Sequence, residues 1–196
     1  MTKAELLLDV PPGYDLSSQT IVGMMAASFD DQSHRLQDTL AGLRVEHLEW
    51  QERPGRNTVG TLLAHLAAVE VEWFFVVCAG LAPDDRKRVI QERLGIDSDG
   101  IVPLEGTHPV SLNGRDLAGY VDLLARARGA THDLLKTWDD PSLDRTAGAF
   151  GLTFSRRWVL YHVLEHFAAH YGQILSLLHC MRDSGVLGLP AQRPGT

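Results

Sequence analysis

The amino-acid sequence predicts an all-α protein built as a four-helix bundle. Four long stretches carry apolar residues every three or four positions, the spacing that gives a helix one apolar face. No stretch shows a convincing strand alternation, and glycine, proline and polar residues separate the four stretches. Helices of this kind bury their apolar faces against one another. In chain order, the four expected helices cover residues 16–43, 58–79, 111 or 113 to 138, and 155–183.

The first expected helix covers residues 16–43 and follows a Pro-Pro-Gly breaker. Ser17 or Ser18 is a candidate N-cap, because a serine hydroxyl can accept a hydrogen bond from a free amide of the first helical turn. Residues 45–56 contain a Pro-Gly pair and lack a helical run. We therefore expect them to form an extended connection.

The second expected helix covers residues 58–79. Asn57 is placed to cap its start, and Gly80 is placed to end it. A short helix is expected to follow over residues 83–94. Two further stretches rich in glycine, aspartate and proline are expected to be loops, namely residues 95–100 and 103–109.

The third expected helix begins at Ser111 or Asn113 and ends where Asp-Asp-Pro follows residue 138. A connection rich in glycine and alanine, residues 142–153, leads to the fourth expected helix, which Gly185 ends. No composition shift divides the 196 residues into two domains. We expect an N-terminal extension, one domain and a C-terminal tail, over residues 1–15, 16–183 and 184–196.

The charge of the chain excludes several classes of partner. Its formal net charge is -7, so it repels nucleic-acid phosphates, and no nucleic-acid partner is expected. Glu70 and Glu72 interrupt the apolar run of residues 69–79, and an acidic residue appears before any signal core develops, so no membrane association or secretion is expected. We expect a cytoplasmic protein in which Cys78 and Cys180 are reduced, partly buried thiols.

Histidines form the candidate metal site. His166 and His170 are four residues apart and share one face of the fourth expected helix, and the apolar neighbours of His65 predict that it faces inwards. A buried imidazole without a partner costs about 1–3 kcal/mol, a cost that a bound cation reduces. His162 lies about 12 Å along the helix axis from His170. One ion can therefore take His162 with His166, or His166 with His170, and the spacing leaves this choice open.

Two strings carry a family resemblance. Residues 50–65 read WQERPGRNTVGTLLAH, and residues 157–174 read RWVLYHVLEHFAAHYGQI. They resemble the DinB-like superfamily of DinB- and YfiT-like proteins, and the resemblance covers residues 16–183. It implies an up-down-down-up four-helix bundle and a homodimer. It also implies that three histidines hold a divalent metal, the last of them marked by the Tyr-Gly-Gln that follows it: His65, His166 and His170.

The resemblance also implies a relation to transferases and isomerases that use mycothiol or bacillithiol. The first expected function is therefore activation of a low-molecular-weight thiol for transfer to a small-molecule substrate. A three-histidine site with an open fourth position can lower the pKa of a bound thiol or water to about 7. Zinc or nickel is the expected metal, although imidazole also suits iron and copper. Two alternatives remain: a hydrolase that uses metal-bound water, and a non-catalytic metal-binding module for interaction or stress response.

Several residues outside the histidine cluster have both a functional and a structural interpretation. Trp73 and Phe74 either line a substrate pocket or pack in the core. The pair Arg156-Arg157 either binds an acidic thiol cofactor or is simply solvated. A ligand histidine needs an acceptor for its second ring N–H, and three acidic residues are candidates for this role: Glu70, Glu72 and Glu165.

Overall fold

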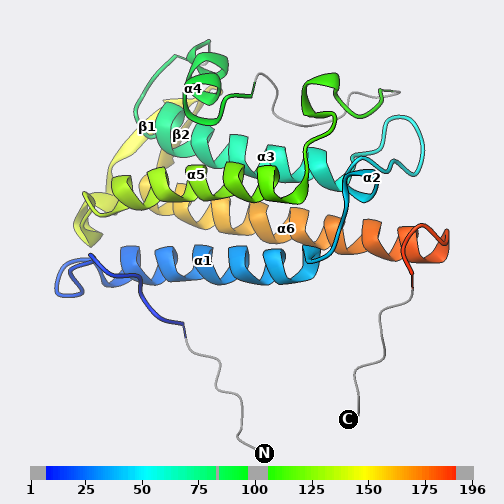
Figure 1. Cartoon of the computed structure of the whole chain (residues 1–196). Coiled ribbons are helices and arrows are strands. Elements are labelled where there is room, and N and C mark those ends of the chain that lie inside the picture. The colour runs from blue at the N-terminus through cyan, green and yellow to red at the C-terminus, as the bar shows by residue number, and fades with distance from the viewer. Residues whose placement is uncertain (1–7, 83, 97–105, 189–196) are drawn as a thin grey trace, which may run out of the picture.

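Four long helices lie side by side and form the body of the fold (Figure 1). The structure is a computed structural model and describes residues 8–82, 84–96 and 106–188. The expected ends of the chain and the expected loop after residue 95 lie in part outside the described residues, namely at 1–7, 97–105 and 189–196. The long helices are α1 (Thr20–Leu40), α3 (Val59–Glu72), α5 (Leu117–Leu135) and α6 (Arg156–Asp183).

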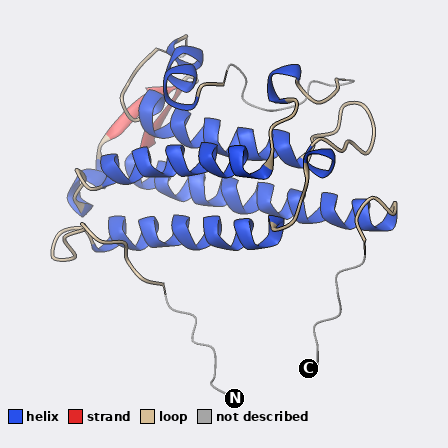
Figure 2. Ribbon diagram, viewed as in Figure 1, coloured by secondary structure: helices blue, strands red, loops and turns tan. Residues whose placement is uncertain are grey.

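Shorter elements connect these helices. Two are α-helices, α2 (Val45–Leu48) and α4 (Asp85–Leu94), and one is a π-helix, η1 (Trp73–Val77), that continues α3. Two are 3-10 helices, η2 (Val110–Leu112) and η3 (Asp140–Asp144), and two are strands, β1 (Thr146–Ala149) and β2 (Leu152–Ser155). Figure 2 shows that helices dominate the described residues. The mainly helical fold that the sequence predicts is confirmed.

The hairpin of β1 and β2 was not expected. The two strands pair antiparallel, with Thr146 opposite Ser155 and Ala149 opposite Leu152. Phe150 and Gly151 form the turn with φ of 52° and 73°, and positive φ at both central residues gives the tight turn whose twist matches that of the strands. Strands of four residues are too short for their alternation to stand out in the sequence.

Several helix starts also differ from expectation. Neither Ser17 nor Ser18 caps α1; the carboxylate of Asp140 in η3 instead accepts hydrogen bonds from the amides of Ile21 and Val22 at 3.0 and 3.1 Å. Thr58, rather than its neighbour Asn57, caps α3 by accepting from the amide of Thr61. The connection over residues 45–56 is not wholly extended, since it contains α2.

The ends of the fourth helix agree with the sequence. α6 begins at Arg156, and the Ser155 hydroxyl caps it by accepting from the Trp158 amide at 3.1 Å. Gly185 follows its last turn with φ of 72°, a conformation that glycine adopts without steric cost. α1 and α5 are shorter than expected at both ends, because turns precede and follow them.

Helix α3 lies at the centre of the fold. It contacts α4, α5 and α6, and all of its residues except His65 are buried. The stretch Val59–Val77 is long and apolar enough to cross a membrane, but 89% of its apolar window is buried inside the structure. A core helix meets the same length and composition test. The burial therefore identifies this stretch as the core of the fold.

A buried ion pair fixes α3 against α5. Arg128 donates from Nε and Nη2 to the two carboxylate oxygens of Glu70 at 2.9 and 3.0 Å, and both side chains are buried. Arg128 also lies 3.6 Å from Asp30 of α1, whose carboxylate is 2.9 Å from His132 Nε2. Buried charges are tolerated when they are paired and hydrogen-bonded. This network of charges therefore orients three helices relative to one another.

Gly60 allows the start of α3 to pack closely on its neighbours. A Cβ atom at this position would lie 2.5 Å from the Tyr120 hydroxyl oxygen of α5 and 3.1 Å from the Leu48 carbonyl oxygen of α2. Tyr120 is fully buried, so its ring has little room to move away.

We predict that Gly60→Ala lowers the free energy of unfolding by about 1–3 kcal/mol, because the added methyl overpacks this contact. Gly129→Ala is the matched control, since Gly129 lies in α5 with no atom within 4 Å of its Cβ position. It is expected to raise stability by about 0.5–1 kcal/mol. Urea denaturation measures both changes. Equal stability of the two variants would contradict the close packing.

Candidate metal centre

Three histidines from two helices meet at one point of the fold. His65 comes from α3, and His166 and His170 come from successive turns of α6. α3 packs against α6, and His65 is the one residue of α3 that is not buried. All three side chains are half-buried, so their ring nitrogens remain accessible to a small ligand.

The ring nitrogens are close enough to share one ion. His166 Nε2 lies 3.1 Å from His65 Nε2 and 3.0 Å from His170 Nε2, and all three potential ligand atoms lie within 4.8 Å of one another. A tetrahedral zinc ion with Zn–N bonds of about 2.0–2.1 Å needs nitrogens about 3.3 Å apart. The three histidines could therefore hold a divalent metal after small ring movements.

The hydrogen-bond chemistry of the cluster also suits a cation. His170 Nδ1 lies 3.0 Å from Gln173 Oε1, so a proton on Nδ1 donates to this oxygen and leaves a lone pair on Nε2. His166 Nε2 faces both other Nε2 atoms, but one hydrogen on it can point to only one of them. A cation accepts all three lone pairs at once. The donor set therefore fits a metal better than a network of neutral imidazoles.

Burial keeps the imidazoles of His166 and His170 neutral. The pKa of His166 is lowered to about 3, chiefly by burial. Electrostatic repulsion from the nearby His170, His65 and His162 adds to this effect. Burial also lowers the pKa of His170, against the opposing effect of its hydrogen bond to Gln173. Neutral imidazole is the form that binds metals. His166 and His170 are thus in their ligand form at neutral pH.

His162 lies outside the cluster. Its ring is 6.0 Å from that of His166 and stacks on Trp158 at 4.6 Å with an interplanar angle of 13°. Its Nδ1 is 3.7 Å from a carboxylate oxygen of Glu165. Of the two pairings that the sequence left open, the structure brings His166 and His170 together with His65. Their role as metal ligands stays a prediction.

The acidic residues that were candidates to orient the ligands have other partners. Glu70 pairs with Arg128, and Glu72 lies 2.7 Å from Arg86. Glu165 accepts from the Tyr161 hydroxyl at 3.2 Å. Gln173 is the residue that orients His170, a role that was not predicted from the sequence. The signal was the spacing of three residues, which places Gln173 beside His170 on the helix surface.

The remaining candidates separate into core and surface. Phe74 and Trp73 are both buried in the core: Phe74 packs against Phe29 and Trp138, and Trp73 contacts His162. Arg156 lies over the Trp138 ring at 4.2 Å, and Arg157 pairs with Asp144 at 3.1 Å on the surface. The two arginines therefore do not form one anion site.

The thiols of the chain are free and partly buried, as expected. Burial raises the pKa of Cys78 to about 12, and the charge of Arg156 only partly offsets this effect. Cys78 is therefore a neutral thiol at pH 7 and a poor nucleophile.

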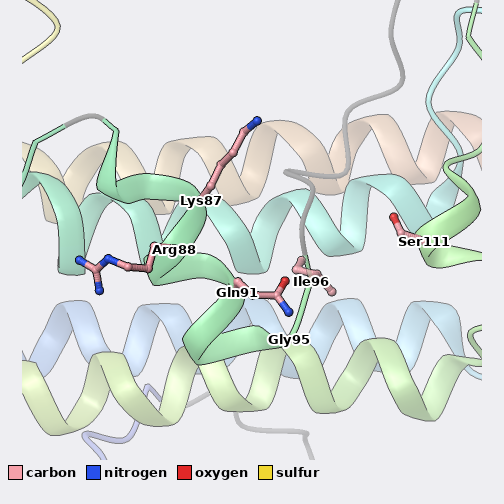
Figure 3. Close-up of a pocket in the computed structure, with 6 residues that line it drawn as sticks. All are labelled: Lys87, Arg88, Gln91, Gly95, Ile96 and Ser111. Atoms are coloured by element: carbon pink, nitrogen blue, oxygen red, sulfur yellow. The ribbon is translucent and has the colours of Figure 1, made fainter.

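A cavity of about 610 Å³ lies away from the histidines. Its lining comes from α4, the residues that follow α4, and η2: Lys87, Arg88, Gln91, Gly95, Ile96 and Ser111 (Figure 3). Arg88 is already paired with Asp85 and Glu92. The lining has no group of metal-binding or nucleophilic side chains, so the histidine cluster is the better candidate site.

We predict that Gln173→Ala lowers zinc affinity by about 10–100-fold, as expected when the partner that orients a ligand histidine is lost. Gln173→Glu retains an acceptor and should keep affinity within a few-fold of wild type. Isothermal titration calorimetry measures both. Unchanged affinity in Gln173→Ala would show that His170 needs no such partner.

Comparisons with known proteins agree with the helical fold. A family model described as the DinB superfamily matches residues 28–174. Two solved structures are similar to this chain. A conserved protein from Enterococcus faecalis is 16% identical with a TM-score of 0.56, and the match covers 80% of this chain and 94% of that one. A DinB-like protein from Bacillus cereus is 19% identical with a TM-score of 0.51, and the match covers 87% of this chain and 96% of that one. No curated protein matches. The chain belongs to the DinB superfamily.

Proposed function

We propose that this protein is a metal-dependent enzyme that activates a low-molecular-weight thiol for transfer to an electrophilic substrate, with zinc or nickel as its metal. The observation that carries the proposal is the convergence of three imidazole rings in a half-buried place, where ligand atoms of His65, His166 and His170 lie within 4.8 Å of one another. The group of ligand atoms has three members among the described residues. Three protein ligands and one open position are typical of catalytic rather than structural zinc sites.

The chain's own residues hold and orient the proposed centre. His65, His166 and His170 bind through Nε2, and Gln173 keeps the Nδ1 proton of His170 in place. The three histidines would leave a divalent ion its full charge, and the ion would supply Lewis acidity that can lower the pKa of a bound thiol to about 7. The rigid packing of α3 on α5 and α6 holds His65 opposite the other two rings.

The proposed reaction needs an external thiol. The thiol loses its proton, its sulfur forms a bond to the electrophilic carbon, and the leaving group departs with its bonding electron pair. Cys78 does not take this role, because its pKa is raised to about 12. Cys180 lies ten residues beyond His170 on α6, or about 15 Å along the helix axis. Neither cysteine replaces the external thiol.

We also propose the up-down-down-up arrangement of the four long helices. Its support is their contacts and their direction: α1 and α3 each contact α5 and α6. The colour gradient in Figure 1 runs one way along α1 and α6 and the other way along α3 and α5. In this arrangement α3 and α6 are antiparallel neighbours, which supports their joint role in the metal centre.

We predict that His65→Ala and His170→Ala each abolish stoichiometric zinc binding while the protein stays folded, because the remaining two histidines form an incomplete site. His179→Ala is the control, since His179 is an exposed residue of the same helix outside the cluster. Metal content after dialysis and circular dichroism measure the outcome. Collapse of the fold in both variants would instead support a structural metal.

We predict that zinc- or nickel-loaded protein accelerates the reaction of chlorodinitrobenzene with a thiol of the mycothiol or bacillithiol type, with release of chloride. The His170→Ala variant should lose the acceleration. Absorbance of the arylated thiol measures the rate. Turnover of ester substrates without thiol would favour the hydrolase, and full metal loading without any turnover would favour the non-catalytic module.

A further inference from the structure

Four rings form a continuous surface beside the three histidines. We call this surface the aromatic shelf; its members are Trp73, Phe154, Trp158 and His162. Trp158 contacts Trp73, Phe154 and His162 at ring-centroid distances of 5.3, 4.8 and 4.6 Å. The Trp73 ring also contacts Phe154 and His162, at ring-centroid distances of 5.1 and 4.7 Å. Each ring thus contacts at least two others.

The shelf adjoins the proposed metal centre. His162 and His166 are neighbouring turns of α6, and their ring centroids are 6.0 Å apart. Trp73 lies at the end of α3, which also carries His65. Three of the four shelf rings therefore come from α6 and from η1, which continues α3, and Phe154 comes from β2. A molecule bound at the cluster can reach the shelf with a short extension.

The shelf is partly open to solvent. Trp158 is 38% exposed, and the hairpin adds two apolar side chains at its edge, Phe150 at 58% and Leu152 at 63% exposure. The Phe150 ring lies 6.1 Å from that of Trp73, and its backbone adopts a positive φ of 52° that bulky residues rarely accept. Trp73 is buried in the core below, and Phe154 is partly buried against that core, so they support the exposed rings. Exposed apolar groups that gather at one place can mark a binding surface.

We propose that the aromatic shelf binds a flat apolar group, such as an aryl ring, of the substrate or thiol whose sulfur occupies the histidine site. This proposal rests on the function proposed above and names its substrate class. Trp73, Phe154 and Trp158 carry no charge, and ring faces stack with other flat π systems in offset or edge-to-face geometry. A saturated ring of similar size gains the apolar contact but not this geometry.

The occupant is a small molecule rather than a second copy of the chain. The shelf is continuous with the histidine cluster through His162, so anything bound there lies next to the open coordination position. A partner chain covering it would close that position. An enzyme site needs access at this point.

The test compares two thiols with the same chain length and a six-membered ring that is aromatic in one and saturated in the other. Nickel-loaded protein is titrated with 2-phenylethanethiol and with 2-cyclohexylethanethiol, and binding is followed by the thiolate-to-nickel charge-transfer absorption. Wild type should bind the phenyl compound about tenfold more tightly, the effect of one favourable aromatic contact. Trp158→Leu should remove this preference while keeping its nickel content.

Tyr161→Leu is the matched control. Tyr161 is 56% exposed on α6, and its hydroxyl bonds to Glu165 rather than contacting the shelf. It should keep the wild-type preference. Equal binding of both thiols by wild type, or a preference that survives in Trp158→Leu, would overturn the shelf proposal. Wild-type dimers that Trp158→Leu converts to monomers would overturn it in favour of a chain interface.

The same titration separates the two proposals. Absence of bound nickel, or of any charge-transfer band with either thiol, counts against the proposed function itself. Normal nickel content and a normal band without phenyl preference count against the shelf alone.

Discussion

The packing of α3 against α6 is the constraint on which the candidate site depends. Every residue of α3 except His65 is buried, so the helix cannot rotate without exposing apolar surface on another side. The bidentate ion pair between Glu70 and Arg128 also fixes the rotation of α3 about its axis. If α3 turned, both charges would be left buried and unpaired. His65 is therefore held towards α6, where it meets histidines from two successive turns.

The neighbouring elements extend this arrangement into a site with two regions. One is polar and holds three imidazole nitrogens; the other is the aromatic shelf, whose rings come from η1, β2 and α6. The hairpin matters here because β2 contacts α6 and carries Phe154, and β1 contacts η1. A metal centre beside an apolar surface is suited to binding a reactive sulfur and an uncharged substrate group side by side.

The sequence predicted the features that depend on local spacing. The helical stripes, the shared face of His166 and His170, and the inward direction of His65 follow from the period of a helix. Contacts between distant segments could not be predicted in this way. Asp140 caps α1 from 119 residues away, and the shelf joins Trp73 to Trp158 only after folding. The strands were too short to show a pattern, and the Gln173 contact has the right spacing but no distinctive sequence signal.

The central claim is that three histidine nitrogens hold one divalent ion with a position left for an exchangeable ligand. X-ray absorption spectroscopy of the zinc-loaded protein tests it most directly. The account predicts three imidazole scatterers at about 2.0–2.1 Å and one light atom that sulfur at about 2.3 Å replaces when a thiol is added. A spectrum with four imidazole or cysteine ligands that does not change with thiol would contradict it.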